Sequence, residues 1–319
     1  NIKMKIAIIG CGNIGLKRAK AIKRDRQTNI KIIVGRKKLK NKTDYVGLKT
    51  AEKLKCKYSS NRSDAIKSNI NSIILSTQPN LFLKIGKEIL NSKKHLLIEK
   101  PLGLNSREAL DLINTAKKNK VFLKTGFNLR FDDGVRLAKK IINKKLLGKI
   151  YFFKVDYVNG SVKTNKNKIG ALSDIGSHCV NLFEYFISKK FRVINNSFQK
   201  NEYFKDDNGF LTIKSNKVLG LIHYSFVRWE NKFFLEISGQ KGSVTIESLP
   251  KWGRQTVTFS KRVYPSGKPK NKKWFFYNDN SWYNEWLFFK NSIQNKDFKD
   301  ISEGYTTMKN LDIIKKFKK

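Results

Sequence analysis

The feature that most constrains the fold is a repeated alternation of short apolar runs with longer helix-period stretches over residues 4 to 125. Five runs have the length and β-branched composition of buried strands: Lys5–Ile9, Ile30–Val34, Ser72–Ser76, His95–Ile98 and Val121–Thr125. Four stretches between them space their apolar residues as a helix does: Ile14–Ile22, Ala51–Lys55, Leu81–Leu90 and Ser106–Lys118. Strands that alternate with helices form a parallel sheet wrapped by those helices. Residues 1–126 are therefore predicted to form an α/β domain.

The pattern changes after residue 126. An amphipathic stretch (Gly134–Ile142), a strand (Lys149–Val158) and a helix near Asp174 come first. Strand-like runs then follow one another without helices between them: Leu211–Ile213, Val218–Val227, Phe233–Gly239, Ser243–Glu247 and Gln255–Ser260. Such a succession predicts a mostly antiparallel, open sheet in a second domain of the α+β class.

The end of the chain is predicted to complete this second domain. The segment Pro265–Lys273 is rich in Lys, Pro and Gly and is predicted to form a loop. Two closing helices are predicted after it, at Trp282–Asn291 and Ile301–Lys318. A length of 319 residues suits about two domains. We therefore assign residues 127–319 to one second domain.

The chain is strongly basic, with 67 Lys and Arg against 25 Asp and Glu and a formal net charge of +42. Such a charge is typical of proteins that bind nucleic acid or membrane lipid. The lysines are dispersed along the whole chain, however, and form neither a basic arm nor a patch interleaved with aromatic residues. We therefore predict neither partner, and a nucleic-acid binder, which would associate in a strongly salt-dependent way, is the last alternative.

The three cysteines, Cys11, Cys56 and Cys179, form no CxxC pair and no even-numbered framework. Neither a disulfide scaffold nor a metal site is indicated, and a reducing compartment fits this pattern. No apolar run approaches the length of about 18 residues that a membrane span needs. The sequence predicts a cytoplasmic protein without a bound metal.

A glycine motif follows the first predicted strand directly: Gly10, Cys11, Gly12, Asn13, Ile14 and Gly15. In a GxGxxG that opens a helix, the first glycine makes the tight turn and the second lets the backbone approach a pyrophosphate. The third allows close packing of the helix, whose N-terminal N–H groups attract the phosphates. The motif predicts a Rossmann domain in which Gly10, Gly12, Asn13, Ile14 and Gly15 bind a dinucleotide.

The end of the second predicted strand bears on the choice between NAD and NADP. An acidic residue at this point usually binds the ribose hydroxyls of NAD, whereas this chain has Gly35 followed by Arg36. A guanidinium can pair with a 2′-phosphate. We predict NADP or NAD as the cofactor and favour NADP.

Several short motifs follow one another along the chain: Thr77, Pro79 and Asn80, then Glu99-Lys100-Pro101, then residues 126–131 and 174–178. In this order they resemble the motifs of the glucose-fructose oxidoreductase and inositol dehydrogenase family, Gfo/Idh/MocA. Glu99-Lys100-Pro101 matches its EKP motif, residues 77–80 resemble its loop after the third parallel strand, and the last two segments match its later blocks. The resemblance covers nearly the whole chain and implies that Thr77, Pro79, Asn80, Glu99 and Lys100 line the cofactor site.

Helical periodicity around the last of these motifs supports the resemblance. Asp174, His178, Asn181 and Tyr185 fall on one helical stripe, and the complementary stripe is apolar: Leu172, Ile175, Cys179, Leu182 and Phe186. An aspartate one turn before a histidine can orient its ring and stabilise the imidazolium form. Gly176 within this helix suggests close approach of cofactor or substrate.

The resemblance implies hydride transfer between the nicotinamide and a secondary alcohol or ketone of a sugar or nucleotide sugar. Lys100 would hydrogen-bond the reacting oxygen, His178 would act as general acid/base, and Asp174 would orient His178. Further contacts to the substrate are assigned to Asn128, Arg130 and Tyr157, since sugars need several polar partners. The resemblance also implies that residues 127–319 form the domain for substrate binding and oligomerisation, and that the protein is a homodimer or homotetramer.

The sequence departs from the family pattern at three places. Phe82 replaces a histidine, Asn181 replaces an acid, and the stretch Gly160–Ile169 is short. These differences leave two alternatives open: a non-catalytic dinucleotide-binding regulator, and a family member that cleaves glycosides through transient oxidation of the substrate.

Overall fold

The structure is a computed structural model that describes residues 3–35, 45–164 and 169–317. The contacts between Cα atoms divide the chain into two compact units. The first unit contains Asn1–Gly126 and Trp282–Met308, and the second contains Phe127–Ser281 and Lys309–Lys319. None of the described helices is both long and apolar enough to span a membrane.

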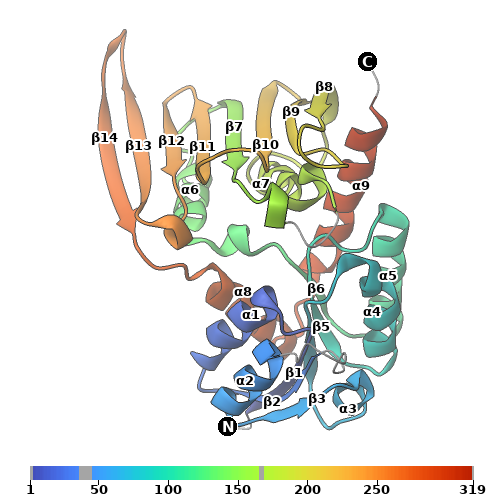
Figure 1. Ribbon diagram of the computed structural model, residues 1–319. Coiled ribbons are helices and arrows are strands. Elements are labelled where there is room, and N and C mark those ends of the chain that lie inside the picture. Colours follow the sequence, from blue (N-terminus) through green and yellow to red (C-terminus); the bar gives the residue numbers. More distant parts are fainter. Residues whose placement is uncertain (1–2, 36–44, 165–168, 318–319) are drawn as a thin grey trace. The chain divides into compact units, whose positions relative to one another are not determined.

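A parallel sheet forms the centre of the first unit (Figure 1). Its strands lie in the order β3-β2-β1-β4-β5-β6 and are parallel throughout. Their bounds are Met4–Ile9 (β1), Thr28–Val34 (β2), Lys57–Ser59 (β3), Ser72–Leu75 (β4), His95–Glu99 (β5) and Leu123–Gly126 (β6). The order reverses between β1 and β4, so the sheet has a topological switch point there, where α/β folds bind ligands. The predicted α/β class is confirmed.

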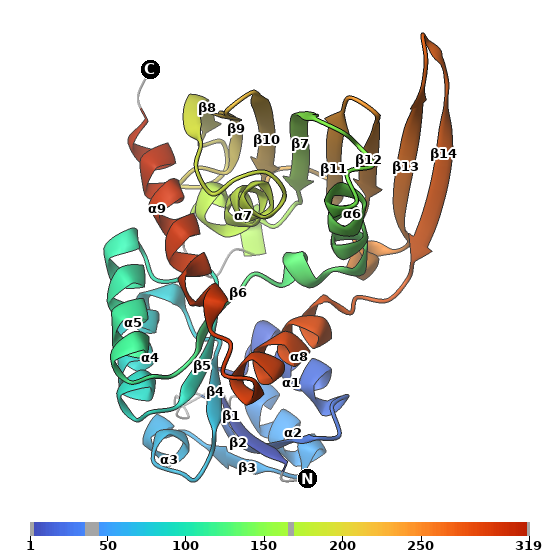
Figure 2. The same ribbon diagram turned by 180° about the vertical axis from the view of Figure 1, so that it is seen from behind.

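The helices of this unit lie on both sides of the sheet. Figures 1 and 2 place α4 and α5 on one side, and α1, α2 and α8 on the other. The bounds of these helices are Asn13–Lys23 (α1), Tyr45–Leu54 (α2), Phe82–Asn91 (α4), Ser106–Lys118 (α5) and Ser281–Gln294 (α8). The short elements β3 and α3 (Arg62–Ile66) were not predicted, because three and five residues are too few to establish a period.

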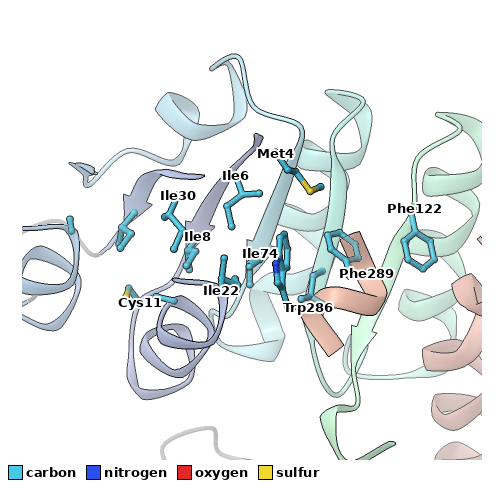
Figure 3. Packing of buried hydrophobic residues seen from close by; sticks show 14 residues of the cluster. Met4, Ile6, Ile8, Cys11, Ile22, Ile30, Ile74, Phe122, Trp286 and Phe289 are labelled. Atoms are coloured by element: carbon cyan, nitrogen blue, oxygen red, sulfur yellow. The ribbon is translucent and has the colours of Figure 1, made fainter. Parts of the chain in front are cut away.

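Helix α8 packs into the core of the first unit, although the division of the sequence at residue 127 assigned it to the second. Trp286 and Phe289 are fully buried in the cluster that contains Ile8, Ile74 and Phe122 (Figure 3). The Trp286 indole and the Lys290 ammonium both donate to Asp25 Oδ2, at 3.0 and 2.7 Å. An aromatic face and a buried ion pair together hold the helix on this core.

The second unit contains an eight-stranded sheet in the order β14-β13-β12-β11-β7-β10-β9-β8. All pairs are antiparallel except β7 with β10, which confirms the mostly antiparallel sheet. The bounds are Ile150–Val158 (β7), Arg192–Gln199 (β8), Asn208–Ser215 (β9), Val218–Ser225 (β10), Lys232–Gly239 (β11), Gly242–Glu247 (β12), Gln255–Val263 (β13) and Gly267–Phe276 (β14). Helices α6 (Asp133–Asn143) and α7 (Ser177–Phe186) lie against one face of this sheet (Figure 1). Alternate residues such as Phe153 and Val155 are buried there.

The loop predicted at Pro265–Lys273 is wrong, because most of it belongs to strand β14. Residues Gly267–Phe276 pair with β13, from Val263↔Gly267 to Gln255↔Phe276. The strand lies at the edge of the sheet, where a proline is tolerated because its missing N–H is not needed for pairing with a further strand. Lys, Pro and Gly therefore indicated a loop where the chain forms an exposed edge strand.

The last helix, α9 (Glu303–Lys316), begins in the first unit and ends in the second. Near its start, Glu303 pairs with the fully buried ammonium of Lys124 on β6. Lys124 also donates to Thr125 O at 2.9 Å. This buried pair is a second ionic link between the sheet of the first unit and the chain that follows α8.

Candidate functional site

The glycine turn after β1 has the geometry that a dinucleotide needs. Gly10 adopts φ +89°, and a Cβ there would lie 2.7 Å from the carbonyl carbon of Ser76. A Cβ on Gly15 would lie 2.2 Å from the carbonyl oxygen of Gly10. A Cβ on Gly12, in contrast, would have nothing within 4 Å. The first and third glycines are thus required by the packing of the protein, whereas the second faces open space.

The N-terminus of α1 begins at this turn and offers its backbone N–H groups. Its N-cap is Gly12, so no side chain caps the first N–H groups of the helix. The first turn also contains no acidic residue. Asn13 and Ile14 are exposed, and 37% of the Ile14 surface is accessible. Because helix N-termini attract anions, this end of α1 is a suitable place for a pyrophosphate.

The loop after β4 lies beside the glycine turn at the switch point of the sheet. The Ser76 hydroxyl donates to Gly10 O at 2.5 Å and so ties the two turns together. The hydroxyl oxygen of Thr77 is buried and has no hydrogen-bond partner in the described protein. Pro79 is buried and Asn80 is exposed, both in the 3-10 turn Pro79–Leu81. A buried hydroxyl without a partner at this edge fits a polar ligand.

Lys100 directly follows β5, the next strand of the same sheet. It is half-buried and is joined to Pro101 by a cis peptide bond. Glu99, just before it, is buried and accepts a 2.7 Å hydrogen bond from Arg18 Nε on α1. Arg18 also pairs with Glu285 on α8, and its guanidinium lies 4.5 Å from the Trp282 ring centroid. The EKP motif is therefore tied to the dinucleotide helix by a buried ion pair.

Arg18 was not predicted, although it lies only three residues beyond the glycine motif. Burial alone would lower the pKa of Arg18, but attraction to Glu285 and Glu99 outweighs it and raises that pKa. A Cβ on Gly126 would lie 2.5 Å from Arg18 Nη2, so a larger residue at position 126 would require the guanidinium to shift. The sequence could have indicated this ion pair, because Arg18 is a basic residue on the side of the first helix that is buried.

Arg36, on which the preference for NADP depends, lies outside the described residues. The described part of β2 ends at Val34, with Gly35 N donating to Ser59 O at 3.0 Å. The choice between NAD and NADP therefore stays a prediction.

In the second unit, Asp174 and His178 lie on consecutive turns of one helical segment. Asp174 is in a π-helical turn, Leu172–Gly176, which continues into α7. π-Helical turns occur often at functional sites. His178 is buried, with 6% of its surface exposed, and Asp174 is half-buried. The predicted apolar stripe, from Leu172 to Phe186, is buried throughout.

Gly176 is close to protein atoms. A Cβ there would lie 3.2 Å from Leu172 Cδ1 and 3.3 Å from Tyr224 Cγ. The packing of the π-helical turn on the Tyr224 ring is therefore a sufficient reason for glycine. The suggested approach of cofactor or substrate is not needed to explain it.

Aromatic side chains surround the His178 imidazole. The Phe127 and Tyr157 ring centroids lie 5.8 and 6.0 Å from it. Tyr157 also packs against Trp252 at 5.9 Å, and its hydroxyl accepts a 3.0 Å hydrogen bond from Lys251 Nζ. The structure thus brings together two predicted residues, Tyr157 and His178. It adds Phe127, which lies in the matched block 126–131, and Trp252 and Lys251, for which the sequence offered no motif.

Asn128 and Arg130 have partners within the second unit. The Asn128 amide donates to Ser281 Oγ at 2.8 Å. Arg130 Nε donates to Asn181 Oδ1 at 2.7 Å, and its guanidinium carbon lies 5.1 Å from the Tyr185 ring centroid. Asn181 therefore receives a guanidinium hydrogen bond at the position where the family has an acid. The substrate contacts of Asn128 and Arg130 stay predictions.

Of the other two departures, Phe82 has a local structural explanation. Phe82 begins α4 and is fully buried, so its ring is part of the core of the first unit. Part of the short stretch Gly160–Ile169 lies outside the described residues. In its described part, a Cβ on Gly160 would lie 2.7 Å from Arg228 O, and Arg228 N donates to Asn159 O at 3.0 Å.

The two remaining histidines, His95 and His223, make structural contacts. His95 Nδ1 accepts the backbone N–H of Phe122 at 2.9 Å, and burial lowers the pKa of His95. His223 stacks on Phe210, with 4.3 Å between the ring centroids. Among the described residues, no group of three or more His, Cys, Asp or Glu could hold a metal ion.

Comparison with known proteins identifies the family. Residues 4–127 match the "Oxidoreductase family, NAD-binding Rossmann fold", and residues 135–245 match the "GFO/IDH/MocA C-terminal domain". These two matches together cover more than half of the chain. The chain belongs to the Gfo/Idh/MocA family. The resemblance inferred from the sequence is confirmed.

Two relatives within Gfo/Idh/MocA are dehydrogenases of sugars or cyclitols by name. Myo-inositol 2-dehydrogenase of Thermotoga maritima is 27% identical over 155 residues, 48% of this chain and 44% of that protein. Glucose-6-phosphate 3-dehydrogenase of Bacillus subtilis is 26% identical over 170 residues, 49% of this chain and 47% of that protein. The matched stretches thus span less than half of each relative.

Solved structures share the fold over nearly the whole length. KijD10, a 3-ketoreductase from Actinomadura kijaniata in complex with NADP and TDP-benzene, superposes with a TM-score of 0.84 at 14% identity, covering 98% of this chain and 97% of that one. A levoglucosan dehydrogenase in complex with NADH gives 0.82 at 18% identity, covering 98% and 96%. At these identities the likeness shows the fold of this Gfo/Idh/MocA member alone.

Proposed function

We propose that this protein is an NAD(P)-dependent oxidoreductase that interconverts a secondary alcohol and a ketone of a sugar or sugar derivative. One observation carries the proposal. The glycine turn, the Ser76–Thr77 loop and Lys100 follow three neighbouring strands, β1, β4 and β5, at the carboxyl edge of one sheet. That edge, beside the switch point, is where doubly wound folds bind nucleotides.

The residues at this edge fit a nicotinamide dinucleotide. The space in front of Gly12 and the uncapped N-terminus of α1 would hold the pyrophosphate, and Thr77 would supply its unused hydroxyl. When bound, the cofactor supplies the site that gives or takes the hydride. NADP is our preferred cofactor, on the basis of Arg36 in the sequence.

Lys100 and His178 have separate roles in the proposed reaction. The Lys100 ammonium would hydrogen-bond the reacting oxygen and stabilise the negative charge that develops there. The His178 imidazole would accept or return the proton of that oxygen, and Asp174 would orient the ring. Tyr157, Asn128 and Arg130 would position the sugar. We further propose a homodimer or homotetramer in the cytoplasm.

The relatives support a sugar as the substrate class. Those with assigned activities include a myo-inositol dehydrogenase and a sugar-phosphate dehydrogenase, and one structural neighbour is a 3-ketoreductase bound to a TDP derivative.

The test is a screen of free sugars, sugar phosphates and nucleotide sugars with both cofactors, read as absorbance of the reduced nicotinamide. The wild type should turn over at least one of them, and Lys100→Ala should lower kcat by about 100-fold or more while cofactor affinity is kept. The exposed Lys117→Ala is the matched control and should be fully active. Undiminished turnover by Lys100→Ala would refute the mechanism. Cofactor binding without any reduction would indicate the regulator, and glycoside cleavage without net reduction would indicate the glycoside-cleaving alternative.

A further inference from the structure

Lys251 is an exposed residue whose ammonium group lies against aromatic rings in the second unit. It belongs to the 3-10 turn Pro250–Trp252, the short helix that precedes β13 in Figure 1. Its Nζ lies 4.4 Å from the Trp252 ring centroid and donates a 3.0 Å hydrogen bond to the Tyr157 hydroxyl. A lysine held by two aromatic side chains loses much of the freedom of its long stem.

This ammonium has no carboxylate partner among the described residues. None of the ion pairs formed by described residues involves Lys251, and its one hydrogen-bond acceptor there is a neutral phenol. A phenol and two ring faces satisfy an ammonium only in part, since an ammonium has three donors. The group is therefore fixed in place with donors left for an anion.

The position of Lys251 connects it to the proposed substrate site. Its Nζ lies 5.4 Å from the Tyr157 ring centroid, and the His178 ring centroid lies 6.0 Å from that of Tyr157. One side chain thus separates the ammonium from the candidate general acid/base. An anionic substituent near Lys251 would be remote from the reacting carbon yet on the same sugar, with the Trp252 and Tyr157 rings beside it.

We propose that Lys251 recognises an anionic group of the substrate, so that the enzyme acts on a sugar bearing phosphate or carboxylate in preference to a neutral one. The inference rests on the proposed function, which assigns Tyr157 and His178 to the substrate. The net charge of +42 favours such substrates by steering them to the protein, but steering alone gives no preference among anions. Lys251 supplies a defined point of recognition.

Pairs of substrates that share one sugar test this proposal. Glucose 6-phosphate and glucuronate are each compared with glucose, and UDP-glucuronate with UDP-glucose, in the wild type and in Lys251→Met. Methionine keeps the apolar stem against Trp252 and removes the charge. Lys272→Met is the matched control, because Lys272 Nζ lies 5.1 Å from the Trp274 ring centroid on the edge hairpin.

The wild type should have the higher kcat/KM for the member of at least one pair whose sugar carries the additional phosphate or carboxylate. Lys251→Met should lower the ratio of the two kcat/KM values in that pair by about 10- to 100-fold, mainly through KM, whereas Lys272→Met should leave it unchanged. The pair that responds identifies phosphate or carboxylate as the recognised group. A ratio that Lys251→Met does not change would overturn the proposal.

Calorimetric titration separates this proposal from the proposed function. If no sugar is turned over with either cofactor, the oxidoreductase assignment fails, whereas binding of glucose 6-phosphate or glucuronate is still measurable. Binding that is present in the wild type and lost in Lys251→Met would support the anion site by itself. Equal binding by the two proteins would contradict it.

Discussion

The two units stabilise their buried charges in different ways. In the first unit, buried charges form ion pairs: Arg18 with Glu99 and Glu285, Lys124 with Glu303, and Lys290 with Asp25. In the second unit, buried carboxylates accept hydrogen bonds mostly from neutral groups. Asp132 accepts from Val135 N and Gln255 Nε2, at 3.1 and 3.0 Å. Asp207 accepts three backbone N–H bonds from residues 201–203, at 2.6 to 3.1 Å.

The difference follows from what each set of contacts has to fix. The ion pairs of the first unit join segments far apart in the chain, since α8 and α9 return to a sheet formed by residues 4–126. The carboxylates of the second unit fix local turns, such as the N-terminus of α6, which Asp132 caps. Removing a charge should therefore be costly in the first unit. In the second unit, a neutral isostere should replace a carboxylate well.

Arg18→Met tests the first half of this comparison and should have the largest effect. It leaves Glu99 and Glu285 buried without their cation, which costs about 3–5 kcal/mol in comparable pairs. Arg62→Met is the control, because the Arg62–Glu88 pair is partly exposed and worth about 0–1 kcal/mol. Denaturant unfolding of both variants gives the two values. Similar small losses in the two variants would show that the buried pairs do not hold α8 in place.

Asp132→Asn tests the second half through pH. Burial raises the pKa of Asp132 from 3.8 to about 6. Because folding favours the protonated carboxyl, its contribution is present in full below pH 3.8 and is lost as the pH rises through about 6. The asparagine variant should therefore gain up to about 3 kcal/mol relative to the wild type between pH 4 and pH 7. Thermal unfolding across this range measures the gain, and the exposed Asp297→Asn is the control. A wild type that unfolds at a higher temperature than Asp132→Asn at pH 7 would contradict this prediction.

The glycine turn shows that the first unit also depends on backbone geometry, with a smaller expected effect. Gly15→Ala should destabilise the unit by about 1–3 kcal/mol, because its Cβ would lie 2.2 Å from Gly10 O. Gly12→Ala should leave the melting temperature nearly unchanged and weaken cofactor binding, since its Cβ enters the open space before α1. Melting curves with and without NADP distinguish the two substitutions. If Gly12→Ala lost as much stability as Gly15→Ala, Gly12 would be required for packing, as Gly15 is, and not for cofactor binding.

The same contrast explains how far the sequence could predict the molecule. The glycine turn was predictable because its motif is local, with a positive φ at Gly10 and a close approach of Gly15 to the Gly10 carbonyl, although Gly10 also lies against Ser76 of the loop after β4. The parallel order of the first sheet followed from the alternation of strands and helices, and the antiparallel sheet from strands without helices between them. In both cases the signal lies within a few neighbouring residues.

The remaining features depend on residues far apart in the chain. Arg18 meets Glu285 across 267 positions, and Tyr157 meets Lys251 across 94. Neither pair forms a motif, so the place of α8 and the lysine beside the His178 site appear only in the structure. Strand β14 was missed for another reason, because Lys, Pro and Gly suit an exposed edge strand as well as a loop.

The proposed reaction transfers a hydride between a sugar carbinol and a nicotinamide. The most direct measurement uses a substrate found in the screen, deuterated at the carbinol carbon, with mass spectrometry of the cofactor after one turnover. The account predicts that the reduced cofactor carries the deuterium and that Lys100→Ala yields none of this product. Substrate consumption that leaves the cofactor free of deuterium would contradict it.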